Sequence, residues 1–232
     1  NKACFRTIME HPQVLAKPSP ERLRAMMAQG APFVASGLIN AWGSCSWQLE
    51  QLQRDYGEVP TCVRLHPASR HRRGAPYEGE CMYVQASLDQ FCRWLGRTAA
   101  DEGAPAAATA DEGGGSPFAP FAREAFVGYA DYQDMPALFR DAPAALAAVD
   151  WTTVLGGDAR DGTQSVLWLG SKGASTPMHY DTYGCNLVAQ CAGEKRWRLY
   201  PPGSHGALRP SRVPYEESSV FAVAGADPLP DA

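Results

Sequence analysis

The sequence lacks several features that would assign a protein class at once. No run of about 18 apolar residues occurs in it, which excludes a membrane-spanning helix. The first residues do not form a charged and then apolar signal sequence, although the chain begins without Met and a removed targeting stretch stays open. The three glycines at 113–115 follow no strand pattern and predict no phosphate-binding loop, and no Cys or Ser lies in the context of an activated nucleophile.

Cysteines are present but form no recognisable pattern. There are seven, an odd number with irregular spacing, and no two of them make a Cys-x-x-Cys pair. A disulfide framework or a zinc ribbon is therefore disfavoured. Free thiols indicate a reducing compartment, so we expect a cytoplasmic protein, with the nucleus as the alternative. The cysteines are Cys4, Cys45, Cys62, Cys81, Cys92, Cys185 and Cys191.

The balance of charge excludes some partners. With 20% charged and 45% hydrophobic residues among 232, the composition is that of an ordinary soluble globular protein with one sizeable core, or a core and a small lobe. A net charge of −4 gives no overall attraction to DNA, RNA or an anionic membrane. Arg64-Leu65-His66 and residues 70–73 form a basic cluster, but no aromatic ladder for stacking bases accompanies it, so we interpret it as a solvated loop.

Helix and strand signals alternate in the first hundred residues. Ser19-Pro20-Glu21 predicts a helix start, with a capping hydroxyl and an early Pro, and Gly30 predicts its end. The apolar run 32–37 predicts a buried strand, and residues 61–65 predict another. Two further helices are expected over residues 47–56, capped by Ser46, and over residues 87–95, closed by Gly96.

The character of the chain changes after a low-complexity stretch. Residues 99–117 carry little apolar bulk beyond Ala, which predicts a flexible surface loop inserted within a domain. Beyond it we expect a short helix over 141–149 and strands over 165–169, 186–191 and 195–200, the last two joined as a hairpin. Short strands after a mixed α/β region suit an antiparallel barrel or sandwich with helical decoration.

One of the five histidines lies in a motif that could bind a metal. In His179-Tyr180-Asp181 an extended backbone would point His179 and Asp181 to the same face, where both can reach one ion. Two histidines and one carboxylate make the facial site of non-haem Fe(II) oxygenases, which leaves half of the octahedron open. The motif alone is weak, because a surface histidine beside a turn-forming aspartate has the same pattern.

The surroundings of the motif resemble a known family. Residues 176–181, Asn-Leu-Val-Ala-Gln at 186–190 and Gly-Glu-Lys-Arg-Trp-Arg-Leu-Tyr-Pro-Pro at 193–202 look like the JmjC/cupin-like hydroxylases, which have the His-x-Asp pair on one strand and such a run after it. Residues 32–42 resemble the family's N-terminal element. The run 212–221 closely resembles a branch of the family that associates with a small heat-shock protein.

The resemblance implies a fold and its limits. The fold is mainly β with α decoration, the double-stranded β-helix of the cupin and JmjC jelly roll, C-terminally truncated in this chain and preceded by a mixed α/β region. The expected parts are an N-terminal α/β part at 1–98, the flexible loop at 99–117 and an incomplete β-helix core at 118–232.

The resemblance also implies Fe(II) and 2-oxoglutarate as cofactors. His179 and Asp181 match two metal ligands, and Lys195 matches the cation that holds the far carboxylate of 2-oxoglutarate. On a strand Lys195 would share a face with Trp197 and Leu199, which we expect to line the interior. The alternative is a lysine that faces water at the hairpin. A buried lysine would need a carboxylate partner.

Three more residues match co-substrate positions of the family. Thr176 matches a hydroxyl that hydrogen-bonds the same carboxylate, with a turn threonine as the alternative. Tyr129 resembles a tyrosine on an upstream strand, with Tyr132 as its competitor and simple packing as the alternative. Asn186 lies where the family often has an asparagine beside the co-substrate.

The third metal ligand of the family, a histidine on a later strand, has no match. His205 directly follows the predicted hairpin in a loop rich in breakers, whereas metal ligands are normally set on rigid elements. Either the sequence is a fragment, or it is a natural short form with exposed strand edges. On these residues alone we expect weak iron binding and slow turnover or none.

The function that the resemblance implies is that of a dioxygenase, an oxidoreductase that hydroxylates a protein or RNA side group with Fe(II) and 2-oxoglutarate. The alternative is a non-catalytic cupin-like module that associates with a small heat-shock protein in the stress response. A third possibility is a cupin that binds another divalent metal structurally.

Overall fold

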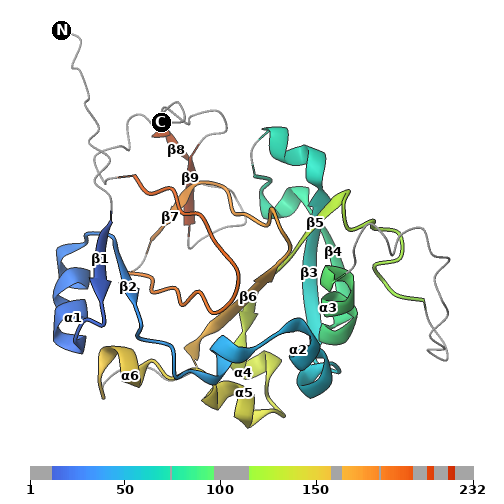
Figure 1. Ribbon diagram of the computed structural model, residues 1–232. Coiled ribbons are helices and arrows are strands. Elements are labelled where there is room, and N and C mark those ends of the chain that lie inside the picture. Colours follow the sequence, from blue (N-terminus) through green and yellow to red (C-terminus); the bar gives the residue numbers. More distant parts are fainter. Residues whose placement is uncertain are drawn as a thin grey trace, which may run out of the picture.

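Three β-sheets with short helices around them make up the part of the chain that the computed structural model describes: residues 12–73, 75–96, 115–157, 164–182, 184–200, 208–211 and 219–222 (Figure 1). The strands are β1 (Gln13–Ala16), β2 (Phe33–Ser36), β3 (Pro60–Pro67), β4 (Met82–Ser87), β5 (Phe126–Asp134), β6 (Val166–Gly170), β7 (His179–Asp181), β8 (Pro210–Ser211) and β9 (Ser219–Ala222). The α-helices are α1 (Pro20–Gln29), α2 (Leu49–Tyr56), α3 (Leu88–Gly96), α4 (Met135–Leu138), α5 (Pro143–Ala147) and α6 (Thr152–Leu155), and the 3-10 helices are η1 (Gly43–Ser46), η2 (Ala68–Arg73) and η3 (Glu78–Glu80).

The first predicted helix is confirmed with its caps. The Ser19 hydroxyl accepts a hydrogen bond from the Arg22 amide at 3.3 Å, and Pro20 occupies the first helical position. Gly30 ends α1 in the left-handed conformation at φ 65°, which glycine adopts without a steric penalty. The strand after it, β2, pairs in parallel with β1 but is not buried as predicted, because this two-stranded sheet leaves alternate side chains such as Val34 exposed.

A four-stranded antiparallel sheet in the order β4-β3-β5-β6 forms the centre of the fold. Helix α3 covers one of its faces, where Val63 and Leu65 of β3 pack against Phe91 and Trp94. Gly128 of β5 is required there, since a Cβ at this position would lie 2.6 Å from the Trp94 ring. The sheet joins strands from both sides of the stretch 97–114, so this stretch interrupts one sheet, whereas the predicted boundaries at 98 and 117 stay predictions.

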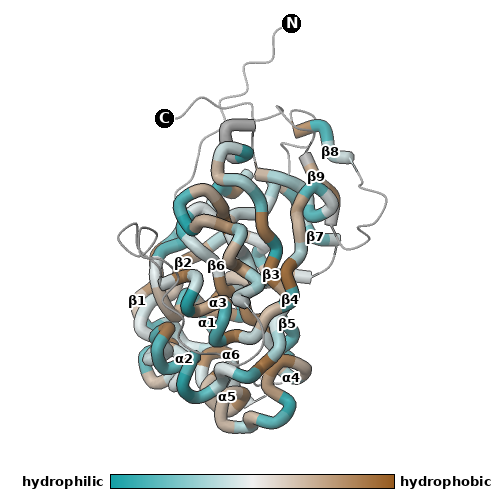
Figure 2. The backbone as a smooth tube through the Cα atoms, turned by 90° about the vertical axis from the view of Figure 1, so that its right-hand side faces the viewer, coloured by the Kyte–Doolittle hydropathy of each residue, from teal (hydrophilic) through white to brown (hydrophobic). Residues whose placement is uncertain are grey.

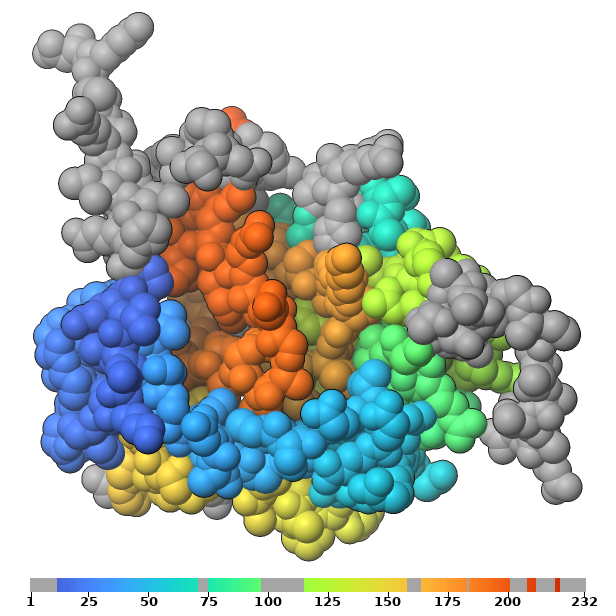
Figure 3. Space-filling model, in the orientation of Figure 1, coloured from blue at the N-terminus to red at the C-terminus, as the bar shows by residue number. Residues whose placement is uncertain are grey.

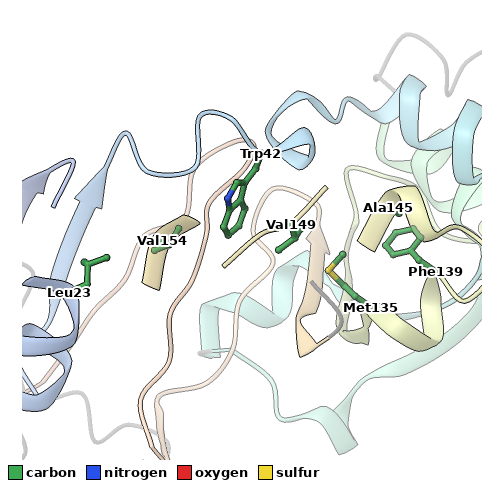
Figure 4. Packing of buried hydrophobic residues seen from close by; sticks show 7 residues of the cluster. All are labelled: Leu23, Trp42, Met135, Phe139, Ala145, Val149 and Val154. Atoms are coloured by element: carbon green, nitrogen blue, oxygen red, sulfur yellow. The ribbon is translucent and has the colours of Figure 1, made fainter. Parts of the chain in front are cut away.

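A second apolar cluster ties the N-terminal region to the helices that follow β5 (Figure 4). Trp42 stands at its middle, with its indole N–H bonded to the Thr153 hydroxyl at 3.0 Å and its ring against Trp151. The buried members come from α1, the loop before η1, and the segment 135–154. They are Leu23, Trp42, Met135, Phe139, Ala145, Val149 and Val154.

The third sheet, in the order β7-β9-β8, lies above β6 in Figure 1. Residues 184–200 follow β7 and occupy the middle of the face in Figure 3, where they are orange. The predicted hairpin strands at 186–191 and 195–200 are not formed. Gly193 does make the bend, at φ 69°, but within the described part of the chain no strand pairs with either arm, and a lone hairpin is marginal in water.

Two smaller predictions also need correction. The cap of α2 is Gln48, not Ser46, because the Ser46 hydroxyl donates to the Gly43 carbonyl within η1. The helix expected over 141–149 is shorter, Pro143–Ala147, since Pro143 starts it. Residues 99–114 of the predicted loop lie outside the described residues.

None of the described helices is long and apolar enough to cross a membrane, and Figure 2 shows the hydrophobic stretches mainly among the central strands.

Candidate functional site

The predicted metal pair lies on the short strand β7. The His179 Nε2 and Asp181 Oδ1 atoms are 3.6 Å apart, and both side chains are partly buried. Antiparallel pairing with β9 sets Phe221 opposite His179, and their rings pack with centroids 5.5 Å apart. As predicted from the alternation of an extended strand, the imidazole and the carboxylate therefore point to one place.

The tautomer of His179 follows from its hydrogen bond. Its Nδ1 lies 2.7 Å from the carbonyl oxygen of Pro177, which can only accept, so Nδ1 carries a proton. In the neutral imidazole, Nε2 then presents a lone pair toward the Asp181 carboxylate. Two acceptor atoms 3.6 Å apart have the spacing to share one cation, because two ligands about 2 Å from one ion stand about this far apart.

Asn186 orients the carboxylate of this pair. Its amide nitrogen donates to Asp181 Oδ2, which leaves Oδ1 for the side that faces His179. Partners that hold a ligating carboxylate in this way tune a metal site from outside its first coordination sphere. Asn186 thus lies beside the metal pair, and its predicted contact with the co-substrate stays a prediction.

Lys195 and Tyr129, two of the predicted co-substrate residues, contact each other. Its ammonium donates to the Tyr129 hydroxyl at 3.1 Å, across 66 positions of sequence. Three aromatic rings surround the ammonium nitrogen, with their centroids at 4.6 Å for Trp197, 5.4 Å for Trp168 and 5.8 Å for Tyr129. Desolvation by this burial lowers the pKa of Lys195. Among the described residues no carboxylate pairs with it.

Tyr129, the residue that Lys195 contacts, is buried. Desolvation first, and then the charge of Asp131, raise the pKa of Tyr129 to about 12, so its hydroxyl stays protonated at physiological pH. A phenol that accepts from Lys195 keeps its own proton available for an anion placed beside the ammonium. Tyr132, the competing residue, instead stands half-exposed at a bulge of β5 with φ 51° and packs on Trp168 at 4.5 Å.

Arg64 and His66, which belong to the basic cluster predicted to be a solvated loop, lie in a buried strand instead. Both side chains are buried in β3, and Arg64 lies 2.5 Å from the Asp131 carboxylate, Nη2 to Oδ2. The prediction was wrong because β3 is covered on both faces and the partner of Arg64 lies on another strand. The one local signal was the apolar alternation of Val63 and Leu65 around Arg64.

Two hydroxyls precede the metal pair. Thr176 is partly buried in the connection between β6 and β7, and its predicted role toward the co-substrate stays a prediction. Ser175, which the sequence did not single out, has a buried Oγ without a hydrogen-bond partner in the described chain. A buried hydroxyl in this position is available to a ligand.

A third protein ligand does not join His179 and Asp181 within the residues that the structure describes, where no group of three potential metal-binding side chains occurs. Trp197 and Leu199, expected to line the interior, are more than half exposed, because residues 195–200 are not in a strand whose alternation would turn them inward. The Trp197 ring still reaches Lys195. His205 lies outside the described residues.

Comparisons with known proteins show which family the chain is similar to. A family model described as "Cupin-like domain" matches residues 18–229. The "HSPB1-associated protein 1 homolog" of Danio rerio is 38% identical over 203 residues, which cover 87% of this chain and 42% of that protein. "HSPB1-associated protein 1" of Mus musculus is 35% identical over 219 residues, covering 94% of this chain and 42% of that protein. "Lysine-specific demethylase JMJ21" of Arabidopsis thaliana is 25% identical over 176 residues, or 74% of this chain and 15% of that protein.

The match to the family model extends over most of the chain, whereas the chain spans about two fifths of the length of the HSPB1-associated relatives. The β-sheets with few helices around them are in keeping with that match. The chain therefore belongs to the cupin-like domain family, as a JmjC-type member.

Proposed function

We propose that this chain carries the site of an Fe(II)- and 2-oxoglutarate-dependent dioxygenase that hydroxylates a protein or RNA side group. His179 and Asp181 would hold the metal, and Lys195 with Tyr129 would hold the far carboxylate of the keto acid. Thr176 would add a hydroxyl to the same carboxylate. The proposal reaches beyond family membership, because members of one fold family differ in chemistry.

The observation that carries the proposal is the environment of Lys195. An ammonium that is partly removed from water and has a single phenol as hydrogen-bond partner is electrostatically incomplete. Because the described residues offer it no carboxylate, a carboxylate from a ligand would supply the missing charge. A metal-binding cupin with a purely structural ion would have no use for such a lysine.

The residues of β7 fit an Fe(II) ion in their donor types. A neutral imidazole nitrogen and a carboxylate oxygen are two of the three ligands in the facial site of non-haem iron oxygenases. A bound Fe(II) would supply oxidation by O2 coupled to decarboxylation of the keto acid. The chain's own contribution is to orient the ligands, since Pro177 fixes the tautomer of His179 and Asn186 fixes Asp181.

Lys195 and Tyr129 would position the keto acid rather than react with it. The ammonium would form a charge-assisted hydrogen bond to one carboxylate oxygen, and the Tyr129 hydroxyl would donate to the other. The rings of Trp168 and Trp197 would keep water from the ion pair and so strengthen it. In this way the binding energy of the far end would orient the keto-acid end toward His179 and Asp181.

Anaerobic titration with Fe(II) and then 2-oxoglutarate tests the proposal. We expect the visible metal-to-ligand absorption band of an iron-bound keto acid, at iron concentrations high enough to load a weak site. The band should be lost in His179→Ala and in Asp181→Ala. It should persist in His205→Ala, the matched histidine control. Absence of the band in the unmodified chain, or its persistence in His179→Ala, would contradict the proposal.

We propose as a second function that the chain associates with a small heat-shock protein. The support is the name of the relatives in zebrafish and mouse, HSPB1-associated protein 1. Co-elution of the purified chain with purified HSPB1 in size-exclusion chromatography is the expected result. Two separate peaks at micromolar concentrations would contradict it. Co-elution without the absorption band would favour a non-catalytic binding module.

A further inference from the structure

A buried ion pair lies directly behind the proposed carboxylate-binding residues. Arg64 of β3 and Asp131 of β5 are 3% and 8% exposed, and their closest atoms, Nη2 and Oδ2, are 2.5 Å apart. Glu78 is a more distant second partner, with its Oε1 at 3.8 Å from Arg64 Nη1. Within the described chain neither Arg64 Nη1 nor Asp131 Oδ2 has a hydrogen-bond partner, so the contact is an ion pair by distance and both groups are only partly satisfied.

Stability alone is a poor explanation for this pair. Removing two charges from water can cost more than their attraction returns, and replacing such pairs by apolar residues of similar volume is often neutral or stabilising. Arg64 is flanked along β3 by the fully buried Val63 and Leu65, whose side chains point to the opposite face of the sheet. An apolar side chain at position 64 would therefore suit the strand.

The position of the pair relative to Tyr129 offers another explanation. Arg64 and Tyr129 are direct cross-strand partners in the β3–β5 register, so both side chains stand on the face of the sheet that looks away from α3. The guanidinium carbon lies 5.8 Å from the centroid of the Tyr129 ring. Asp131, two residues further along β5, holds the guanidinium in this place.

The Tyr129 ring is thereby contacted from several directions. Arg64 lies over it, and Gly170 of β6 lies opposite it, so close that a Cβ there would be 2.9 Å from the ring. Lys195 bonds its hydroxyl. The register of β5 shifts between Ala130 and Gln133, so Asp131 lies within a β-bulge. Bulges are common next to functional sites, where they redirect a side chain.

We infer that the Arg64–Asp131 pair is a positioning device, which fixes the Tyr129 ring and through its hydroxyl fixes the Lys195 ammonium for a dicarboxylate. The inference rests on the proposed function, because it assigns these two residues to the same carboxylate site. Arg64 and Asp131 do not touch the ligand in this account. They determine how well Tyr129 and Lys195 are placed to do so.

The test removes both charges at once. The double variant Arg64→Met/Asp131→Leu leaves neither partner as an isolated buried charge, and Arg54→Met/Asp55→Leu is the matched control on an exposed ion pair. Three quantities are measured on the full chain: the urea midpoint, the dissociation constant of Mn(II), and the dissociation constant of 2-oxoglutarate from quenching of tryptophan fluorescence. Trp168 and Trp197 beside Lys195 make fluorescence a direct reporter.

We expect the urea midpoint and the Mn(II) affinity of the double variant to match those of the unmodified chain, while 2-oxoglutarate binds about tenfold more weakly. Arg64→Lys keeps the charge without the planar group, and its affinity for 2-oxoglutarate should lie between those of the unmodified chain and the double variant. The control pair should change none of the three quantities.

Unchanged 2-oxoglutarate affinity in the double variant would overturn the inference and leave the proposed function standing. Failure of the double variant to fold would also overturn it, because the pair would then serve the fold. No binding of 2-oxoglutarate to the unmodified chain would instead overturn the proposed function, and with it the inference.

Discussion

The four-stranded sheet with the helix and turn that cover it, and the segment 184–200, differ in how they bury their large apolar side chains. Against one face of the sheet, Phe91 and Trp94 of α3 and Phe118 of the turn before β5 are fully buried and pack ring on ring. In the segment, Trp197 and Leu199 are more than half exposed although their residue types suit a core. The first group builds the fold, whereas Trp197 stands beside the ammonium of Lys195.

The proposed site lies where these two regions meet. The sheet contributes Tyr129 from a strand that is buried along most of its length, and the segment contributes Lys195 from a backbone outside any described strand. The comparison teaches that one side of the proposed carboxylate site is fixed by the core, while the other side depends on few contacts. Damage to the two regions should therefore appear in different measurements.

The largest expected effect is the difference in stability between two variants, each with one aromatic side chain truncated in one of the regions. Phe118→Ala should lower the free energy of unfolding by about 3–5 kcal/mol, because it opens a cavity in a fully packed cluster. Trp197→Ala should lower it by less than about 1 kcal/mol, because the ring is 53% exposed. Urea denaturation measures both.

The ligand affinities of these two variants should run in the reverse order. Trp197→Ala should weaken 2-oxoglutarate binding about two- to fivefold, through loss of the ring that shields the Lys195 ammonium. Phe118→Ala, measured below its unfolding transition, should bind nearly as tightly as the unmodified chain. Equal losses of stability in the two variants would remove the distinction between the regions.

A smaller effect is expected from adding one methyl group beneath Tyr129. In Gly170→Ala the new Cβ would stand 2.7 Å from the Ala174 Cβ and 2.9 Å from the Tyr129 ring. The ring must move, so we expect a loss of about 1–3 kcal/mol in stability and weaker 2-oxoglutarate binding. Gly157→Ala, where a Cβ meets nothing within 4 Å, is the control and should change neither. A Gly170→Ala variant with unchanged affinity would show that the ring position is unimportant.

The smallest effect is the pH dependence that burial gives Lys195. Because desolvation lowers the pKa of Lys195, the ammonium is lost at a lower pH than that of an exposed lysine. Affinity for 2-oxoglutarate should therefore be full below this lowered pKa and fall as the pH rises through it. Stability should change in the opposite sense: the cost of the buried charge is present below the lowered pKa and is relieved as the pH rises toward the unfolded value. Lys195→Met should abolish both pH dependences. The affinity is measured by calorimetric titration, and the stability by urea denaturation, each at several pH values.

The sequence carried enough information for elements whose signals are local. Helix α1 begins and ends at the predicted caps, Ser19 and Gly30, and α3 begins where Ser87 and Gln90 exchange hydrogen bonds, each side chain bonding the other's backbone amide. His179 and Asp181 share one side of β7 because strand geometry alone brings residues i and i+2 together.

Features that depend on distant partners could not be predicted in this way. Strand β5 shows no alternation because both of its faces are buried, and the segment 186–200 has a strand-like sequence but no described partner strand. Arg64 is charged and so was assigned to solvent, yet Asp131 on another strand compensates its charge in the interior. Pairing between distant strands, not local composition, decides each of these cases.

The most direct test of the central claim is calorimetric binding of two keto acids in the presence of Mn(II), a redox-inert substitute for iron. 2-Oxoglutarate and pyruvate share the keto-acid end, and only 2-oxoglutarate has the distant carboxylate that Lys195 should bind. We predict that the unmodified chain prefers 2-oxoglutarate by about 10- to 100-fold, and that Lys195→Met binds both equally weakly. Equal affinity for the two acids in the unmodified chain, or a preference that survives in Lys195→Met, would contradict the account.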